Sequence, residues 1–147
     1  MKALPCIALC GALLGGTCFA GWIDQRESPV MLDLLQRSGV QTQTDASGAS
    51  VMQIVNVSCV HSYPIHTSVG DSDDTTTCSY TDKSDSKALS LPDSDAKVFF
   101  ELAAHYGGNL NQYDQNDIRY QDFTAESVKC EQDVGPDEPW LCEVSDQ

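Results

Sequence analysis

Four cysteines, Cys59, Cys78, Cys130 and Cys142, organise the downstream part of this 147-residue chain into two similar units. In each unit a short run of strand-favouring residues carries one cysteine, a polar segment follows, and a second such run carries the other. Cysteines on neighbouring antiparallel strands can meet across the pair. Among the three pairings that four cysteines allow, this predicts Cys59–Cys78 and Cys130–Cys142. Loop-closure entropy gives each such disulfide a stabilisation of about 3 kcal/mol.

The likeness of the two units has two interpretations. Val57-Ser58-Cys59 ahead of Cys78-Ser79-Tyr80 parallels Val128-Lys129-Cys130 ahead of Cys142-Glu143-Val144. The parallel can reflect an internal duplication, or two unrelated hairpins that need the same covalent brace. The sequence alone favours two unrelated hairpins and leaves duplication open.

Residues 1–20 have the pattern of a cleavable secretory signal. Lys2 gives a positive start, Ala3 to Gly16 is largely apolar, and Cys18-Phe19-Ala20 resembles the small-x-small sequence that signal peptidase accepts. Cleavage is expected before Gly21. The apolar stretch is too short to cross a bilayer as an ordinary helix.

Removal of the signal leaves 127 residues, which predicts a single domain over residues 21–147. Three cysteines leave with the signal, and the remaining even number suits an oxidising compartment. We therefore expect a secreted protein without a transmembrane segment, periplasmic or extracellular if the source is bacterial. A lipid anchor on Cys18 is the alternative, and Thr17 argues against it because a smaller residue is expected beside a lipid-modified cysteine.

Hydrophobic periodicity and turn residues predict an α+β fold. A short amphipathic helix is expected over 28–38 with Ser28 as its N-cap, and a main core helix over 94–106. We expect an antiparallel sheet of four to six strands packed on the main helix, with the short N-terminal helix near an edge. This layout is similar to the cystatin-like shape, a similarity that implies no activity. The expected strands cover 40–44, 50–60, 75–81, 127–132 and 140–145.

Alternation along the strand over 50–60 predicts that both of its faces are partly covered. It assigns the residues to the two faces as follows: Val51, Val55, Val57 and Cys59 to one, Met52 and Ile54 to the other.

Two polar segments are expected to be loops. Residues 67–87 are rich in Ser, Thr and Asp, apart from the strand near 75–81. Residues 109–122 are amide-rich with two interleaved tyrosines, a composition that recognition loops also use, although an ordinary polar connection would look similar. The candidate partner-binding residues are Tyr113, Asp114, Asp117 and Tyr120.

The charge balance excludes some partners. The chain has 22 acidic and 8 basic side chains and a formal charge of −14, which becomes −15 when Lys2 is removed with the signal. This charge opposes binding to nucleic acid and to anionic lipid, both of which need cationic clusters. It favours encounter with a basic protein. Solubility, or adaptation to a salty medium, would produce the same charge.

Chemistry-bearing motifs are weak in this sequence. Two disulfides leave the domain no thiolate for catalysis or metal binding. His61 and His66 lack the spacing of a zinc site, and His105 is expected to be structural. The carboxylates of 71–74 could hold calcium, but they lack the features of an EF-hand loop, so a solvated acidic loop is the better interpretation. No cofactor or metal is expected.

These observations favour a small acidic secreted or periplasmic binding protein, such as an inhibitor or an immunity-type protein for a basic partner. Two alternatives remain. A small exported hydrolase would be favoured by histidine and carboxylate side chains that converge in a cleft. A structural envelope component would be favoured by a large apolar patch or an open sheet edge. Enzymatic activity is unsupported but open, and so is the oligomeric state.

Overall fold

The computed structural model describes residues 20–65 and 74–145, which form one antiparallel sheet and two helices, α2 (Ser28–Arg37) and α3 (Asp93–Tyr106). The sheet has eight strands where four to six were predicted. Apart from Ala20, the predicted signal lies outside the described residues, as do His66 and Asp71 to Asp73. The strands are β1 (Ala20–Trp22), β2 (Gln43–Thr44), β3 (Ser50–Pro64), β4 (Thr75–Asp82), β5 (Asp85–Ala88), β6 (Asn109–Gln115), β7 (Ile118–Gln132) and β8 (Trp140–Ser145).

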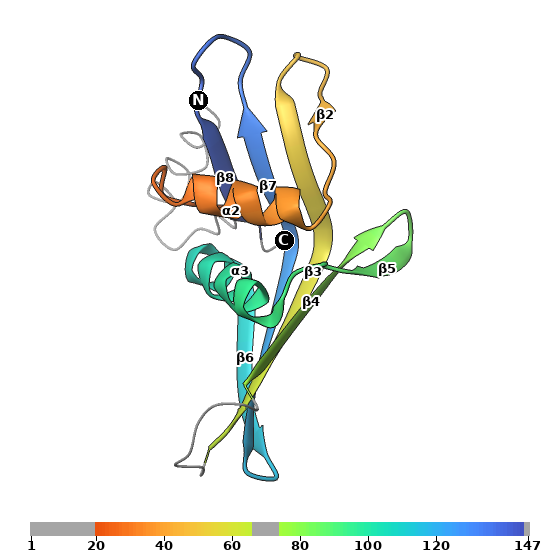
Figure 1. Ribbon diagram of the computed structural model, residues 1–147, viewed down its shortest axis with the longest axis vertical. Coiled ribbons are helices and arrows are strands. Elements are labelled where there is room, and N and C mark those ends of the chain that lie inside the picture. Colours follow the sequence, from red (N-terminus) through yellow and green to blue (C-terminus); the bar gives the residue numbers. More distant parts are fainter. Residues whose placement is uncertain (1–19, 66–73, 146–147) are drawn as a thin grey trace, which may run out of the picture.

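The long strands β3 and β7 form the centre of the sheet (Figure 1). They pair from Ser50 opposite Gln132 to Pro64 opposite Ile118. The strand order is β1-β8-β7-β3-β4-β5, with β2 also paired to β3 and β6 also paired to β7. Strands β6 and β8 lie one after the other along the same side of β7, because β6 pairs with residues 118–124 and β8 with 127–132.

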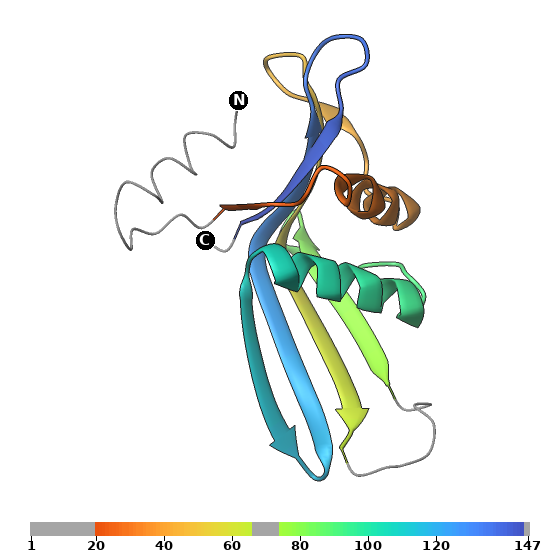
Figure 2. The same ribbon diagram turned by 90° about the vertical axis from the view of Figure 1, so that its left-hand side faces the viewer.

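Both helices lie over the same face of the sheet, and the lower parts of β3, β4, β6 and β7 extend beyond them (Figure 2). The buried core joins helix and strand residues in one cluster. The helices contribute Met31, Leu34, Leu35, Phe99, Phe100 and Ala103, and the sheet contributes Met52, Ile54, Val57, Phe123, Val128, Val144 and the four cysteines.

The central strand β3 contains a bulge at Asn56. Its register against β4 shifts between Val55 and Ser58, and Asn56 has a φ of 51°. A bulge inserts one extra residue into a strand. Residues on either side of the bulge that simple alternation would place on opposite faces therefore lie on the same face. The predicted assignment to two opposite faces is therefore wrong. The residues that share the core are Met52, Ile54, Val57 and Cys59.

Both predicted disulfides are confirmed. Cys59 is directly opposite Cys78 in the β3–β4 pair, and Cys130 is directly opposite Cys142 in the β7–β8 pair. Each disulfide therefore joins neighbouring strands at a matched position, as the strand–loop–strand pattern predicts.

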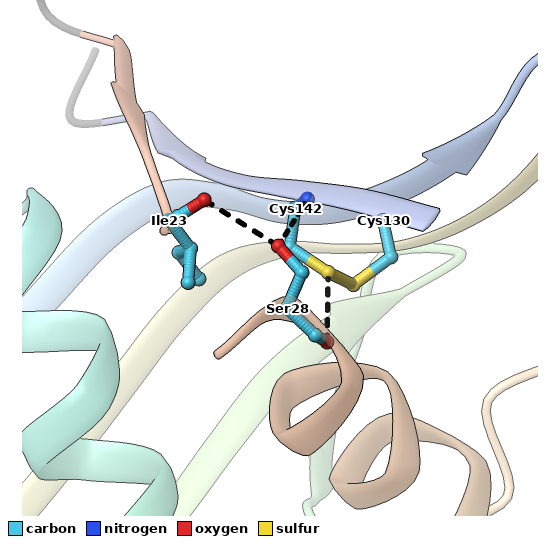
Figure 3. The surroundings of a disulfide bond; sticks show 4 residues. All are labelled: Ile23, Ser28, Cys130 and Cys142. Carbon is cyan, nitrogen blue, oxygen red and sulfur yellow. Dashed lines mark hydrogen bonds between the residues drawn. A yellow bond between two sulfur atoms is a disulfide. The ribbon is translucent and has the colours of Figure 1, made fainter. Parts of the chain in front are cut away.

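Ser28 connects α2 to the second disulfide (Figure 3). Its buried hydroxyl accepts a hydrogen bond from the Cys142 N–H at 3.1 Å and donates one to the Ile23 carbonyl at 3.4 Å. Its carbonyl oxygen lies 3.5 Å from Cys142 Sγ. The helix is preceded by Glu27 as N-cap, without a side-chain cap. The predicted capping role of Ser28 is therefore wrong, because its hydroxyl bonds to other segments instead.

Two predicted loops are strands. Residues 109–122 form β6 and the first part of β7, and the predicted strand over 127–132 is the end of that longer strand. Residues 85–88 form β5, which pairs with β4. These segments are polar on both sides, so they lack the alternating apolar residues on which strand prediction depends.

The two halves of the domain repeat one order of elements. The order α2, β2, β3, β4 in the first half matches α3, β6, β7, β8 in the second, including the disulfide between the last two strands. The helices match as well: Val30-Met31-Leu32-Asp33-Leu34 parallels Val98-Phe99-Phe100-Glu101-Leu102, and the leading valines are 44% and 43% exposed. We interpret the domain as an internal repeat.

Candidate functional site: the β6–β7 hairpin

A two-residue turn joins β6 to β7. Gln115 is paired with Ile118, and the residues between them, Asn116 and Asp117, have φ values of 54° and 62°. Positive φ at both central positions is the geometry of a type I′ turn, whose twist matches that of the flanking strands. Asn and Asp tolerate this conformation better than most residues. The candidate Asp117 therefore lies at the exposed tip of a hairpin.

The candidate tyrosines meet on the outer face of the hairpin. Tyr113 and Tyr120 are directly opposite each other, with ring centroids 5.1 Å apart and the planes within 17° of parallel. Tyr113 is nevertheless 42% exposed. Cross-strand aromatic pairs stabilise a sheet, so the hairpin holds two amphipathic rings in a defined position at the surface.

The candidate Asp114 is paired with Arg119 on the other face. The Arg119 guanidinium donates from Nε at 2.8 Å and from a terminal nitrogen at 3.1 Å to the two carboxylate oxygens. These hydrogen bonds lower the pKa of Asp114, and Asp114 followed by Tyr63 raises the pKa of Arg119. Arg119 and Tyr63 were not predicted from the sequence, because cross-strand partners can be identified only once the register is known.

A second row of side chains crosses the same face closer to α3. Gln121 bonds to Gln112 at 2.9 Å and to His61 Nδ1 at 2.8 Å. His61 Nε2 contacts the Asp74 carboxylate at 2.6 Å, and Lys97 of α3 donates to the other oxygen at 3.1 Å. Burial alone would raise the pKa of Asp74, but the hydrogen bonds from Lys97 and His61 outweigh it and lower the pKa.

This second row is suited to bracing rather than catalysis. His61 is 5% exposed and both of its ring nitrogens have partners, so it has no nitrogen available to a substrate. Its contacts connect β3 to β7, to α3 through Lys97, and to the start of β4 through Asp74. Residues 20–65 and 74–145 include no group of three or more His, Cys, Asp or Glu side chains that could hold a metal ion.

A groove of about 390 Å³ between α2 and α3 contains the remaining histidine of the described chain. Glu27, Glu101 and His105 line it beside exposed Val30 and Val98. Glu27 accepts a hydrogen bond from the Tyr106 hydroxyl, and this raises the pKa of Tyr106. His105 contacts the Tyr106 ring edge to face. The groove thus brings a histidine near two carboxylates.

Strand β6 is exposed along its whole length. All seven of its residues are exposed, and within the described residues β7 is the only strand that pairs with it. Gly108, with a φ of 75°, leads the chain from α3 into this strand. A Cβ at Gly108 would lie 2.4 Å from the Phe123 ring, so only glycine fits where β6 starts.

Carboxylates determine the surface charge because most of the basic side chains are already paired. The basic side chains in ion pairs with carboxylates are Arg26, Arg37, Lys87, Lys97, Arg119 and Lys129.

Neither helix in the described part of the chain is long and apolar enough to cross a bilayer.

Comparison of the chain with protein-family models, with curated proteins and with solved structures finds no match. The function is therefore inferred from the chain's own residues.

Proposed function

We propose that this protein is a small acidic exported binding protein that presents the β6–β7 hairpin to a basic protein partner, as an inhibitor or an immunity-type protein does. The observation that carries the proposal is a solvent-exposed strand held in place by a stacked tyrosine pair and a bidentate ion pair. A preorganised surface element loses little conformational entropy when it binds, which favours recognition. Tyr and amide side chains supply the contact area and the hydrogen bonds.

The charge supports a cationic partner. Asp117 lies at the turn and Asp122 lies on the outer face opposite Asn111. With a formal charge of −14, the chain attracts a basic protein over long range, and salt screens this attraction. The two disulfides are compatible with a secreted protein.

The test begins with capture from the source's secreted and envelope proteins at low and high salt, followed by calorimetric titration of any stoichiometric basic partner. Replacement of Asp117 and Asp122 by Asn should weaken binding about fivefold at low salt, since each exposed pair contributes about 0.5 kcal/mol. The matched control replaces Asp137 by Asn and Glu138 by Gln in the exposed β7–β8 turn at the opposite end of the sheet (Figure 1). The control removes the same charge and should leave affinity within twofold. Absence of a stoichiometric partner at both salt concentrations would refute the proposal.

A small hydrolase is a second candidate, favoured by the groove that Glu27, Glu101 and His105 line. A general base in such a site needs a partner that orients its ring, and here the His105 ring contacts the Tyr106 ring edge to face. Screening with ester, amide and glycoside substrates tests this candidate. Activity that is lost in His105→Ala while the fold persists would support it.

A structural envelope component is a third candidate, favoured by the open edge of β6. It requires that copies of the chain assemble through this edge. Sedimentation equilibrium at low and high salt separates it from the binding protein, which should remain monomeric.

A further inference from the structure

We propose that the free edge of β6 binds an extended segment of the basic partner as an added β-strand. This inference rests on the proposed binding function and names its mode. In strand addition, main-chain hydrogen bonds provide affinity and alternate side chains provide specificity.

The pairing of the hairpin identifies the main-chain groups that would bind. Gln115 and Ile118 flank a two-residue turn, so they exchange hydrogen bonds with each other, and alternate residues of β6 then bond to β7. The N–H and C=O groups of the residues between them point to the free edge. These residues are Leu110, Gln112 and Asp114.

The other edge strands are shorter, whereas β6 is long and lacks the usual protection. Strands β1 and β2 have three and two residues, and β5 has four, including Asp85 and Lys87. Strand β6 has seven residues with no lysine, proline or glycine, and its one charged residue, Asp114, is already paired with Arg119. Natural proteins protect exposed edges with lysine, proline, bulges or short length, so a long edge without these features marks a site of strand pairing.

The internal repeat supports a role for this edge beyond folding. In the first half, β2 occupies the position of β6 and pairs with β3 through two residues only. Although β2 is so short, the first half still pairs its long strand β3 with β7 and still forms its disulfide, Cys59–Cys78. The five additional residues in β6 are therefore not required to build the repeated unit.

Charge and side chains specify the occupant. A second copy would bring together two chains with a formal charge of −14 each, whereas a basic segment is attracted. Leu110 is 52% exposed and lies on the same face as Phe123, its cross-strand partner, whereas Asp122 lies on the outer face opposite Asn111. The matching segment therefore alternates, with apolar residues on the face of Leu110 and cationic residues on the outer face.

The test uses two synthetic peptides of equal charge and the isotope-labelled protein produced by export. The peptide Lys-Val-Lys-Thr-Lys-Val-Lys can form a strand, whereas in Lys-Pro-Lys-Pro-Lys-Pro-Lys every second residue has no N–H and has a φ fixed by its ring, which disfavours a paired strand. We expect the first to bind at least about tenfold more tightly and to slow hydrogen exchange at the amides of Leu110, Gln112 and Asp114.

A protein variant provides the second arm. Gln112→Pro removes one outward N–H without removing a bond to β7, and Gln112→Ala is the control that keeps the N–H but loses the same side chain. Binding of the strand-forming peptide should fall about tenfold in Gln112→Pro relative to Gln112→Ala.

The outcomes separate the mode of binding from the function. Equal affinity for both peptides, or equal affinity in the two Gln112 variants, would overturn strand addition while leaving partner capture intact. Concentration-dependent dimers that Gln112→Pro abolishes would make a second copy the occupant and would also overturn it. The capture experiment with secreted and envelope proteins tests the binding function separately, because it does not depend on how the partner binds.

Discussion

Replacement of Gly108 by Ala should destabilise the protein by about 3 kcal/mol. Gly108 has a φ of 75°, a conformation that costs a residue with a Cβ about 1–2 kcal/mol. The new Cβ would also lie 2.4 Å from the ring of Phe123 and 2.7 Å from the Thr124 carbonyl oxygen. Phe123 is fully buried, so relief of the clash must displace core atoms, at a cost of about 1–3 kcal/mol.

Gly39→Ala is the matched control. Gly39 has a φ of 89°, but no atom lies within 4 Å of the position of its Cβ. It therefore incurs the backbone cost of about 1 kcal/mol without the clash, and both variants share the same gain from a less flexible unfolded chain. Urea unfolding at constant slope should separate the two variants by about 2 kcal/mol. Equal midpoints would refute the reasoning that the close approach to Phe123 requires glycine where β6 starts.

Three further variants test the bracing contacts. Asp74→Asn should cost about 2 kcal/mol at neutral pH, because charge-assisted hydrogen bonds are lost. The folded-state pKa of Asp74 lies below its ordinary value of 3.8, so this stabilisation is present above pH 3.8 and disappears as the pH falls through the folded-state pKa. The urea midpoints of wild type and variant should therefore converge in acid. Cys130→Ala with Cys142→Ala should lower the melting temperature by about 10 °C in calorimetry, from the loss of about 3 kcal/mol, and an unchanged melting temperature would contradict the bracing role. Ser28→Ala should cost about 2 kcal/mol in urea unfolding because the buried N–H of Cys142 loses its acceptor, whereas a cost below about 0.5 kcal/mol would mean that another group replaces the hydroxyl.

The disulfides and helices could be predicted because their signals are local. Each cysteine lies in a short strand-favouring run, and the apolar faces of both helices repeat at the helical period and end at glycine. The β6–β7 hairpin could not, because β6 is exposed on both faces and so has no apolar alternation. Its turn uses Asn116-Asp117 instead of the usual Asn-Gly, which weakened the one remaining signal.

Half of the candidate site was visible in the sequence. Tyr113 and Tyr120 were identified from composition, and the structure brings them together as a cross-strand pair. The partner of Asp114 was missed, as was the contact between His61 and Gln121, because 60 positions separate the latter two residues. The register between β6 and β7 places Arg119 opposite Asp114, and the register between β3 and β7 places Gln121 opposite His61.

The residues that stabilise the fold are not those proposed to bind the partner, so binding can be altered separately from stability. The fully buried side chains lie in α2, α3, β3, β7 and β8, and both disulfides are buried among them. All seven residues of β6 are exposed, so substitutions at its outward positions remove little buried apolar area. Variants of Gln112 lose only the exposed hydrogen bond from Gln121, so they should unfold within about 1 kcal/mol of wild type, apart from the backbone effect of proline. If they do, any change in affinity reports the edge of β6 itself and not the loss of the domain.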